Sequence, residues 1–170
     1  MGYNDVLSKK IFQQTGAYME IKAADIMNRD VVCVKRSTTL QELVEILFTK
    51  RVGGVPVVDD KEELIGIVSK TDLVTYGLEC ELCEILGNKK ENPLLSDLQN
   101  FANIQGQEPS SVTVEQIMTT PAIAADPNAP VTDIVRIMLA KKIHRIIIAE
   151  GKKVVGIITT MDLLRLLDKR

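Results

Sequence analysis

Two short stretches of the sequence place a hydroxyl and a carboxylate at the same spacing. Ser69 precedes Asp72 by three residues, and Thr159 precedes Asp162 by three. The spacing is that of a capping box, in which the acid accepts from the backbone N–H of the residue before the helix. A carboxylate can also hold both hydroxyls of a ribose diol, and N–H groups at a helix start can bind phosphate. The pattern therefore predicts either a structural cap or a nucleotide site.

The adjacent pair His144 and Arg145 is a second candidate. Arginine binds phosphate through a planar fork of donors, and histidine can donate beside it. A structural histidine, with Arg145 paired to Glu150 at the surface, is the alternative. We favour phosphate contact, because the pair stands at the start of a predicted strand.

Cys80 and Cys83 form a C-x-x-C pair that could bind zinc or carry redox chemistry. Zinc requires two further ligands, and His144 is the only histidine in the chain. Neighbouring glutamates would raise the pKa of these thiols and make them less reactive. We expect two helix cysteines about one turn apart.

Composition excludes several classes of function. The 170 residues are 45% hydrophobic and can bury a proper core, either as one domain or as two halves that share one. The net charge is −2, and there are three tyrosines, three phenylalanines and no tryptophan, which argues against a nucleic-acid surface. No apolar run approaches the ~20 residues of a membrane span, and the N-terminus lacks a signal-peptide pattern. We expect a cytoplasmic protein that binds neither nucleic acid nor membrane.

The elements that must position these residues occur twice along the chain. In the first half we expect a helical turn at 24–27, a strand at 31–34, a helix from Thr38 or Thr39 to about Lys50 that Gly53-Gly54 stop, a hairpin of strands 55–58 and 64–68, and a helix from Ser69. In the second half we expect their counterparts at 117–118, 122–125, 131–142, 146–148, 154–158 and 161–167. The offset is 91 residues up to Glu150 and 90 after it, which indicates a duplicated unit.

This repeat divides the chain into four parts. We expect an N-terminal helical segment at 1–20, a first repeat at 21–78, a partly helical linker at 79–113 and a second repeat at 114–170. Apolar residues at helical spacing in 1–20 and around 94–104 favour packing on a neighbouring element or subunit.

The duplicated motifs resemble those of the CBS domain, named after cystathionine β-synthase. The matching pattern is Asp-Ile-Met at 25–27, Val-x-Gly-x-Pro-Val-Val-Asp at 52–59 and Leu-x-Gly-Ile-Val-Ser-x-x-Asp-Leu at 64–73. Asp25–Val74 fits one copy and Gln116–Leu164 fits the other, although Ile147 stands where the family often has proline. Two copies in one chain look like a tandem CBS pair, or Bateman module.

The resemblance implies an α+β (mixed α/β) fold, in which two β-α-β-β-α repeats pack sheet to sheet with pseudo-two-fold symmetry. It also implies a regulatory, energy-sensing module without catalytic machinery, which binds AMP, ADP or ATP and requires no cofactor. Many such pairs form a homodimer and act on a client protein.

The resemblance further implies two composite clefts. The first would hold the base with Met27, Val31, Val32, Val52 and Gly53, the ribose with Thr159 and Asp162, and the phosphates with His144 and Arg145, a pair similar to that in the γ subunit of AMP-activated kinase. The second would hold the base with Met118, Ala122, Ile123 and Ile143, and the ribose with Ser69, Thr71 and Asp72.

Three alternatives remain open at this point. The chain could be a ligand-free CBS homodimer that serves as an interaction scaffold, since its apolar helical stripes need a cover. It could bind S-adenosylmethionine or methylthioadenosine in place of a nucleotide. It could also be a metal or redox protein through Cys80 and Cys83.

Overall fold

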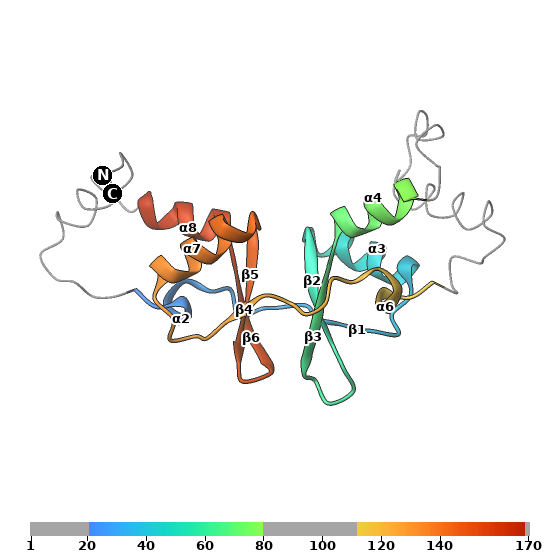
Figure 1. Ribbon diagram of the computed structural model, residues 1–170, viewed down its shortest axis with the longest axis horizontal. Coiled ribbons are helices and arrows are strands. Elements are labelled where there is room, and N and C mark those ends of the chain that lie inside the picture. Colours follow the sequence, from blue (N-terminus) through green and yellow to red (C-terminus); the bar gives the residue numbers. More distant parts are fainter. Residues whose placement is uncertain (1–20, 80–111, 169–170) are drawn as a thin grey trace, which may run out of the picture.

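The computed structural model describes residues 21–79 and 112–168, which form two similar halves beside each other (Figure 1). The elements of the first half are α2 (Ala23–Ile26), β1 (Val34–Lys35), α3 (Leu40–Thr49), β2 (Gly54–Val58), β3 (Leu64–Ser69) and α4 (Lys70–Glu79). Those of the second half are α6 (Val114–Ile117), β4 (Ala124–Ala125), α7 (Val131–Lys141), β5 (Arg145–Glu150), β6 (Lys153–Thr159) and α8 (Thr160–Leu167). The order confirms the predicted duplication.

Each half contains a three-stranded mixed sheet. The strand orders are β1-β2-β3 and β4-β5-β6, with the outer short strand parallel to the middle strand and the hairpin antiparallel. Both hairpins shift register at the same place, at Val57/Val58 and at Ile148/Ala149. The α+β prediction is therefore confirmed, and the likeness of the halves extends to strand register.

Helix α3 begins and ends for local reasons. Thr39 accepts a hydrogen bond from the Glu42 backbone N–H at 3.3 Å, and the Glu42 carboxylate accepts from the Thr39 N–H at 2.8 Å. One face of the helix is fully buried, namely Leu40, Leu43, Val44 and Leu47. The helix ends at Thr49, because Arg51 turns the chain with a left-handed φ of 53°. The expectation that Gly53-Gly54 stop this helix was wrong, since Gly54 already begins β2.

The predicted strands at 31–34 and 122–125 are shorter than expected and end one residue later in the first case. Only Val34–Lys35 and Ala124–Ala125 pair as strands. The chain before them crosses to the opposite hairpin instead: Asn28 and Ile157 exchange backbone hydrogen bonds of 2.9 and 3.0 Å. Thr119 and Ile67 make the equivalent exchange in the other direction. The apolar residues at 31–33 and 122–123 are therefore not part of a paired β-strand.

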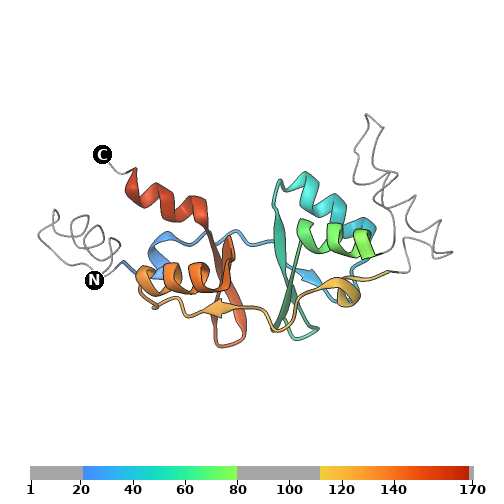
Figure 2. The same cartoon turned by 45° about the horizontal axis from the view of Figure 1, so that its top comes forward.

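The first helix of each half belongs to the core of the other half. Ala23 and Met27, from the start of the first half, are buried with Ile134, Met138 and the middle of β5. In the reverse direction, Val112 and Val114 are buried in one cluster with residues of α3 and β2. Figure 1 shows α2 beside the second sheet and α6 beside the first, and Figure 2 shows the two connecting segments (blue and yellow-orange) crossing from one half to the other. The two repeats therefore share their cores.

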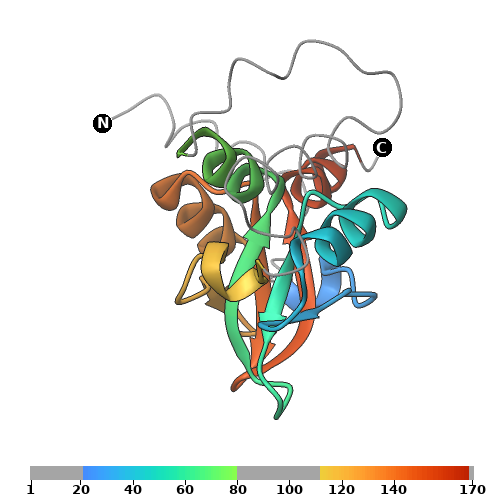
Figure 3. The same ribbon diagram turned by 90° about the vertical axis from the view of Figure 1, so that its right-hand side faces the viewer.

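The two ends of the sheets differ in what they carry. Helices α4 and α8 follow β3 and β6 at one end, and the hairpin turns lie at the other (Figures 1 and 3). The Ser69–Asp72 and Thr159–Asp162 motifs span these strand-to-helix junctions. Both motifs therefore lie at the same end of the molecule.

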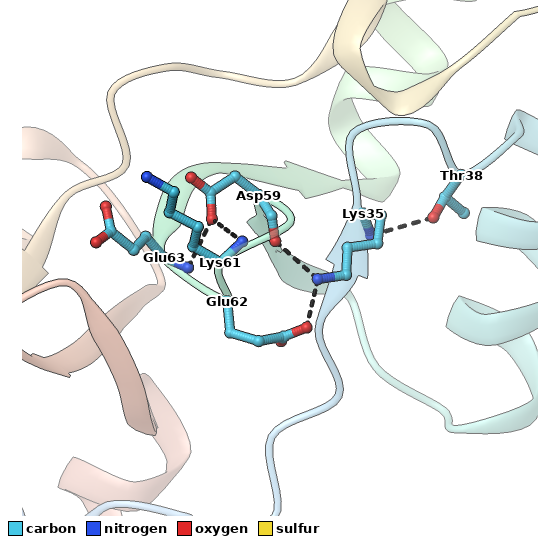
Figure 4. A network of polar contacts seen from close by, with 6 residues as sticks. All are labelled: Lys35, Thr38, Asp59, Lys61, Glu62 and Glu63. Carbon is cyan, nitrogen blue, oxygen red and sulfur yellow. Dashed lines mark hydrogen bonds and ion pairs between the residues drawn. The ribbon is translucent and has the colours of Figure 1, made fainter.

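Polar contacts fix the hairpin turn of the first half (Figure 4). The Asp59 carboxylate accepts from the backbone N–H groups of Lys61 and Glu63, both at 2.9 Å. Lys35 donates to the Asp59 carbonyl at 2.7 Å and also contacts Glu62. The Lys152 ammonium of the other hairpin lies 2.9 Å from the Glu63 carboxylate. The turns of the two halves are thus joined at their tips.

The predicted N-terminal helix at 1–20 and most of the linker at 79–113, with Cys80 and Cys83, lie outside the described residues. Within residues 21–79 and 112–168, no helix is long and apolar enough to cross a membrane.

Candidate functional site

Asp162 has one oxygen committed to the backbone and the other paired with an arginine. Its Oδ2 accepts from the Thr159 N–H at 2.8 Å and from the Thr159 hydroxyl at 2.6 Å. Its Oδ1 accepts from Nη1 of Arg165 at 3.0 Å. The Asp162 side chain is 15% exposed, whereas that of Arg165 is 75% exposed. We call Thr159, Asp162 and Arg165 the Asp162 site.

Asp72 repeats the cap with a different second partner. Its Oδ2 accepts from the Ser69 N–H at 2.7 Å and from the Ser69 hydroxyl at 2.6 Å. Its Oδ1 accepts from the Thr119 hydroxyl at 3.3 Å. We call Ser69, Asp72 and Thr119 the Asp72 site. The predicted capping role is confirmed at both sites, and in each the cap occupies one carboxylate oxygen.

The starts of β2 and β5 bring Gly53 and His144 to these junctions. The Lys70 N–H, at the start of α4, donates to the Gly53 carbonyl at 3.1 Å. The Thr160 N–H, at the start of α8, donates to the His144 carbonyl at 3.0 Å. His144 is exposed, and its carbonyl lies at the start of α8 beside the Asp162 site.

The side chain of Arg145 crosses to the other repeat. A β-carbon on Gly53 would stand 2.6 Å from its Nη2, and one on Gly54 would stand 2.6 Å from its Nη1. The guanidinium therefore occupies space that only glycines leave open. Burial lowers the pKa of Arg145, and the negative charge of Asp72 opposes that shift. Among residues 21–79 and 112–168, no hydrogen bond or ion pair satisfies this guanidinium.

Gly66 and Gly156 have the same role at the centre of the interface. Met27 packs on Gly156, with its Cγ 2.7 Å from the position of a β-carbon there. Met118 packs on Gly66, where a β-carbon would also stand 3.0 Å from the Thr119 carbonyl oxygen. A glycine in a strand lets a flat base or a neighbouring backbone approach closely. The structure places a methionine and the crossing backbone against them.

A family model decides the identity of this arrangement. The model of the CBS domain matches residues 23–79 and again 114–169. The chain belongs to the CBS domain family. It is a tandem CBS pair, as the sequence motifs predicted.

Relatives and solved structures agree with this assignment. The chain is 26% identical over 143 residues to an uncharacterized protein of Methanocaldococcus jannaschii, covering 84% of this chain but 41% of that protein. The CBS domain of a CBS domain containing membrane protein from Sphaerobacter thermophilus is 27% identical, with 96% of each chain covered and a TM-score of 0.68. The structure of CBSX2 in complex with AMP is 26% identical, with 88% of this chain and 98% of that chain covered and a TM-score of 0.64.

The remaining predicted residues of the CBS pair are partly buried, except for Thr71. Val32, Val52 and Met118 are partly buried against the first core, and Ile123 and Ile143 against the second. In addition, Val31 and Ala122 are partly buried and Thr71 is exposed.

The predicted grouping of Arg145 can be compared with its contacts. The sequence placed Arg145 in one cleft with Gly53 and Asp162. Its guanidinium lies at Gly53-Gly54, and the aspartate whose charge affects its pKa is Asp72. Sequence reasoning missed Thr119 and Arg165. The spacing of Arg165, three residues after an acid on a predicted helix, could have indicated its contact, whereas that of Thr119 depends on the crossing of the repeats.

Within the described ranges, no group of three or more histidine, cysteine, aspartate or glutamate side chains is placed to hold a metal ion. The zinc and redox hypothesis for Cys80 and Cys83 concerns residues outside those ranges and stays a hypothesis.

Proposed function

We propose that this CBS pair is a non-enzymatic regulatory module of the cytoplasm that binds AMP, ADP or ATP between its repeats and thereby acts on a client protein. Each nucleotide would place its ribose diol on the second oxygen of Asp72 or Asp162. That oxygen is held by side chains, the Thr119 hydroxyl or the Arg165 guanidinium, which can give way to a ligand. The first oxygen keeps the helix capped, so the helix start remains intact on binding.

The half-buried guanidinium of Arg145 is the observation that carries this proposal. A charge partly removed from water is less stable unless a counter-charge or acceptors compensate it, and Arg145 is only partly buried. Asp72 is near enough to affect the pKa of Arg145 but makes no ion pair with it. A phosphate group bound beside Asp72 would supply charged acceptors, because arginine binds phosphate through two parallel hydrogen bonds. The phosphate position is thus proposed for the Asp72 site, with Arg145 contributed by the other repeat.

The AMP complex of CBSX2 supports the class of ligand, since AMP combines a diol with a phosphate. His144, which is exposed beside the Asp162 site, is proposed as a further phosphate donor there. The partly buried apolar residues of the predicted base positions stay as proposed contacts of the adenine.

Calorimetric titration tests the proposal. Wild-type chain is titrated with AMP, ADP, ATP, adenosine and S-adenosylmethionine, and then Asp72→Ala and Arg145→Met are compared with it. Asp25→Ala is the matched control, since the Asp25 carboxylate caps α2 with a 2.8 Å bond to the Lys22 N–H away from both sites. We expect Asp72→Ala and Arg145→Met to weaken nucleotide binding about tenfold or more, and Asp25→Ala to leave it unchanged. Preferential binding of S-adenosylmethionine, or no loss in either site variant, would refute the nucleotide assignment.

A second proposal concerns self-association. Phe48 on α3 and Leu139 on α7 occupy equivalent positions of the two repeats and are 61% and 73% exposed. Val74 on α4 and Leu164 on α8 are a second equivalent pair, at 53% and 50%. Exposed apolar side chains repeated by the pseudo-symmetry favour an isologous contact, so we infer that a second copy of this chain covers them in a homodimer.

A further inference from the structure

We propose that Arg165 makes the Asp162 site select adenosine ligands that carry a phosphate over neutral or cationic ones. This inference rests on the proposed function and assigns ligand selectivity to a residue one helical turn beyond the cap.

The first step is the use of the two Asp162 oxygens. Two hydrogen bonds from Thr159 converge on Oδ2, whereas Oδ1 has Arg165 as its partner. A diol therefore has to bind Oδ1, either beside the guanidinium or in its place. Any ligand that uses Asp162 consequently lies next to Arg165.

The second step is the ease with which Arg165 can move. Its side chain is 75% exposed, and ion pairs of this kind at the surface are worth little because water and salt screen them. The guanidinium can turn from Oδ1 to a ligand without disturbing any buried contact. The group of the ligand that the guanidinium then contacts determines how the displacement affects affinity.

The third step is the chemistry of the ligand. A phosphate gives the displaced guanidinium a bidentate partner of full charge. Adenosine gives it none. S-adenosylmethionine carries a sulfonium at the 5′ position, where AMP has its phosphate, and this cation repels the guanidinium, while its carboxylate lies farther away beyond a three-carbon chain. Binding of a phosphate-bearing ligand thus replaces the ion pair that the diol disrupts, whereas neither the 5′ hydroxyl of adenosine nor the 5′ sulfonium of S-adenosylmethionine replaces it.

Among the described residues, the Asp72 site has no arginine on the second oxygen of its carboxylate. Its Oδ1 accepts from the neutral Thr119 hydroxyl, and the residue equivalent to Arg165 is Thr75. The two sites therefore read phosphate in different ways. Arg145 acts on the Asp72 site from the opposite repeat, and Arg165 acts on the Asp162 site from the same helix.

The test measures binding at the Asp162 site alone, in a chain that carries Asp72→Asn. AMP, adenosine and S-adenosylmethionine are titrated into this chain and into the same chain with Arg165→Thr, which copies the residue of the first repeat. Arg136→Thr is the matched control, because Arg136 makes the same exposed pair with Asp133, three residues earlier on α7, at 2.8 Å. Thermal unfolding of each variant verifies that it is folded.

We expect Arg165→Thr to weaken AMP binding about tenfold, to leave adenosine binding unchanged or stronger and to strengthen S-adenosylmethionine binding. The ratio of AMP to adenosine affinity falls about tenfold, and Arg136→Thr leaves it unchanged. An unchanged ratio in Arg165→Thr, in a chain that still binds AMP, overturns the role of Arg165 and leaves the proposed function standing. If the wild-type chain binds no adenosine ligand, the proposed function and this inference fall together.

Discussion

The Arg145 guanidinium lies against the backbone of Gly54 in the other repeat, where a β-carbon would stand 2.6 Å from Nη1. Arg145 and Gly54 occupy equivalent positions of the duplicated unit. The two copies have therefore diverged in a complementary way, one gaining a large cation and the other keeping the space for it.

Gly53→Ala and Gly54→Ala are expected to differ in whether Arg145 can relieve them. At Gly53 the three atoms nearest the new methyl all belong to the flexible Arg145 side chain, so we expect a loss of about 1 kcal/mol in unfolding free energy. At Gly54 it also meets Ser69 Cβ and the Val68 carbonyl, both at 2.9 Å, so we expect a loss of about 2–3 kcal/mol. Urea unfolding measures both.

Combining each change with Arg145→Ala provides the control. Stability is restored in the Gly53→Ala chain, because the clashing side chain is gone, but stays low in the Gly54→Ala chain, because the clash with the backbone persists. Equal rescue of both variants would show that Arg145 is not seated as described.

Gly156→Ala is expected to loosen the contact between the repeats. The added methyl overlaps the side chain of Met27, which is 8% exposed and packed in the second core. We expect a loss of about 2–3 kcal/mol from overpacking, measured by chemical denaturation. Shortening the methionine in a Met27→Ala, Gly156→Ala chain recovers part of it relative to the sum of the single changes. Simple additivity of the two losses would contradict this contact.

The hairpin turn at Asp59 predicts a pH dependence. Backbone hydrogen bonds from Glu63 and, to a smaller extent, Lys61 hold the pKa of Asp59 below its ordinary value. The folded state thus favours the charged carboxylate, so its contribution to stability is present above the ordinary aspartate pKa. It is lost as the pH falls through 3.8 toward the lowered folded pKa.

Thermal unfolding between neutral and acidic pH measures this effect. An Asp59→Asn chain is less stable at neutral pH and loses less stability on acidification than the wild type does. Asp60→Asn, at the neighbouring exposed position of the turn, is the control and retains the wild-type slope. Parallel curves for the wild type and Asp59→Asn would rule out the carboxylate as the source.

Leu139→Glu is expected to dissociate the proposed homodimer. A charge at a residue 73% exposed in the isolated chain costs little in folding but is unfavourable when covered by a second copy. Light scattering should show a halved mass, with an unchanged unfolding temperature at low concentration. Lys141→Glu, about 200° further around α7, should leave the mass unchanged. A wild-type chain that is monomeric at all concentrations removes the basis for this inference.

The sequence predicted those parts of the fold that depend on local patterns. Thr39 and Glu42 specify a helix start, and β-branched runs around Gly66 and Gly156 specify hairpins, so these elements follow from adjacent residues. The duplication indicated that both aspartates act alike, and their caps confirm it.

The contacts between the two repeats could not be predicted from the sequence. Thr119 reaches Asp72 only because the chain after α6 crosses to the opposite hairpin, and no local spacing encodes that crossing. The direction of the Arg145 side chain has the same origin. Arg145 was thus predicted as a phosphate-binding residue, but Asp72 was not predicted as the carboxylate beside it.

The exchanged first helices have a consequence for how fragments of this protein fold and for how substitutions compensate each other. Ala23 belongs to the core of the second repeat and Val114 to that of the first, both without exposed surface. Neither repeat carries a complete interior, so two separately expressed fragments should remain unfolded alone and regain structure when mixed. A harmful substitution in one repeat can accordingly be compensated by a change some 90 residues away, in the other copy of the ancestral unit.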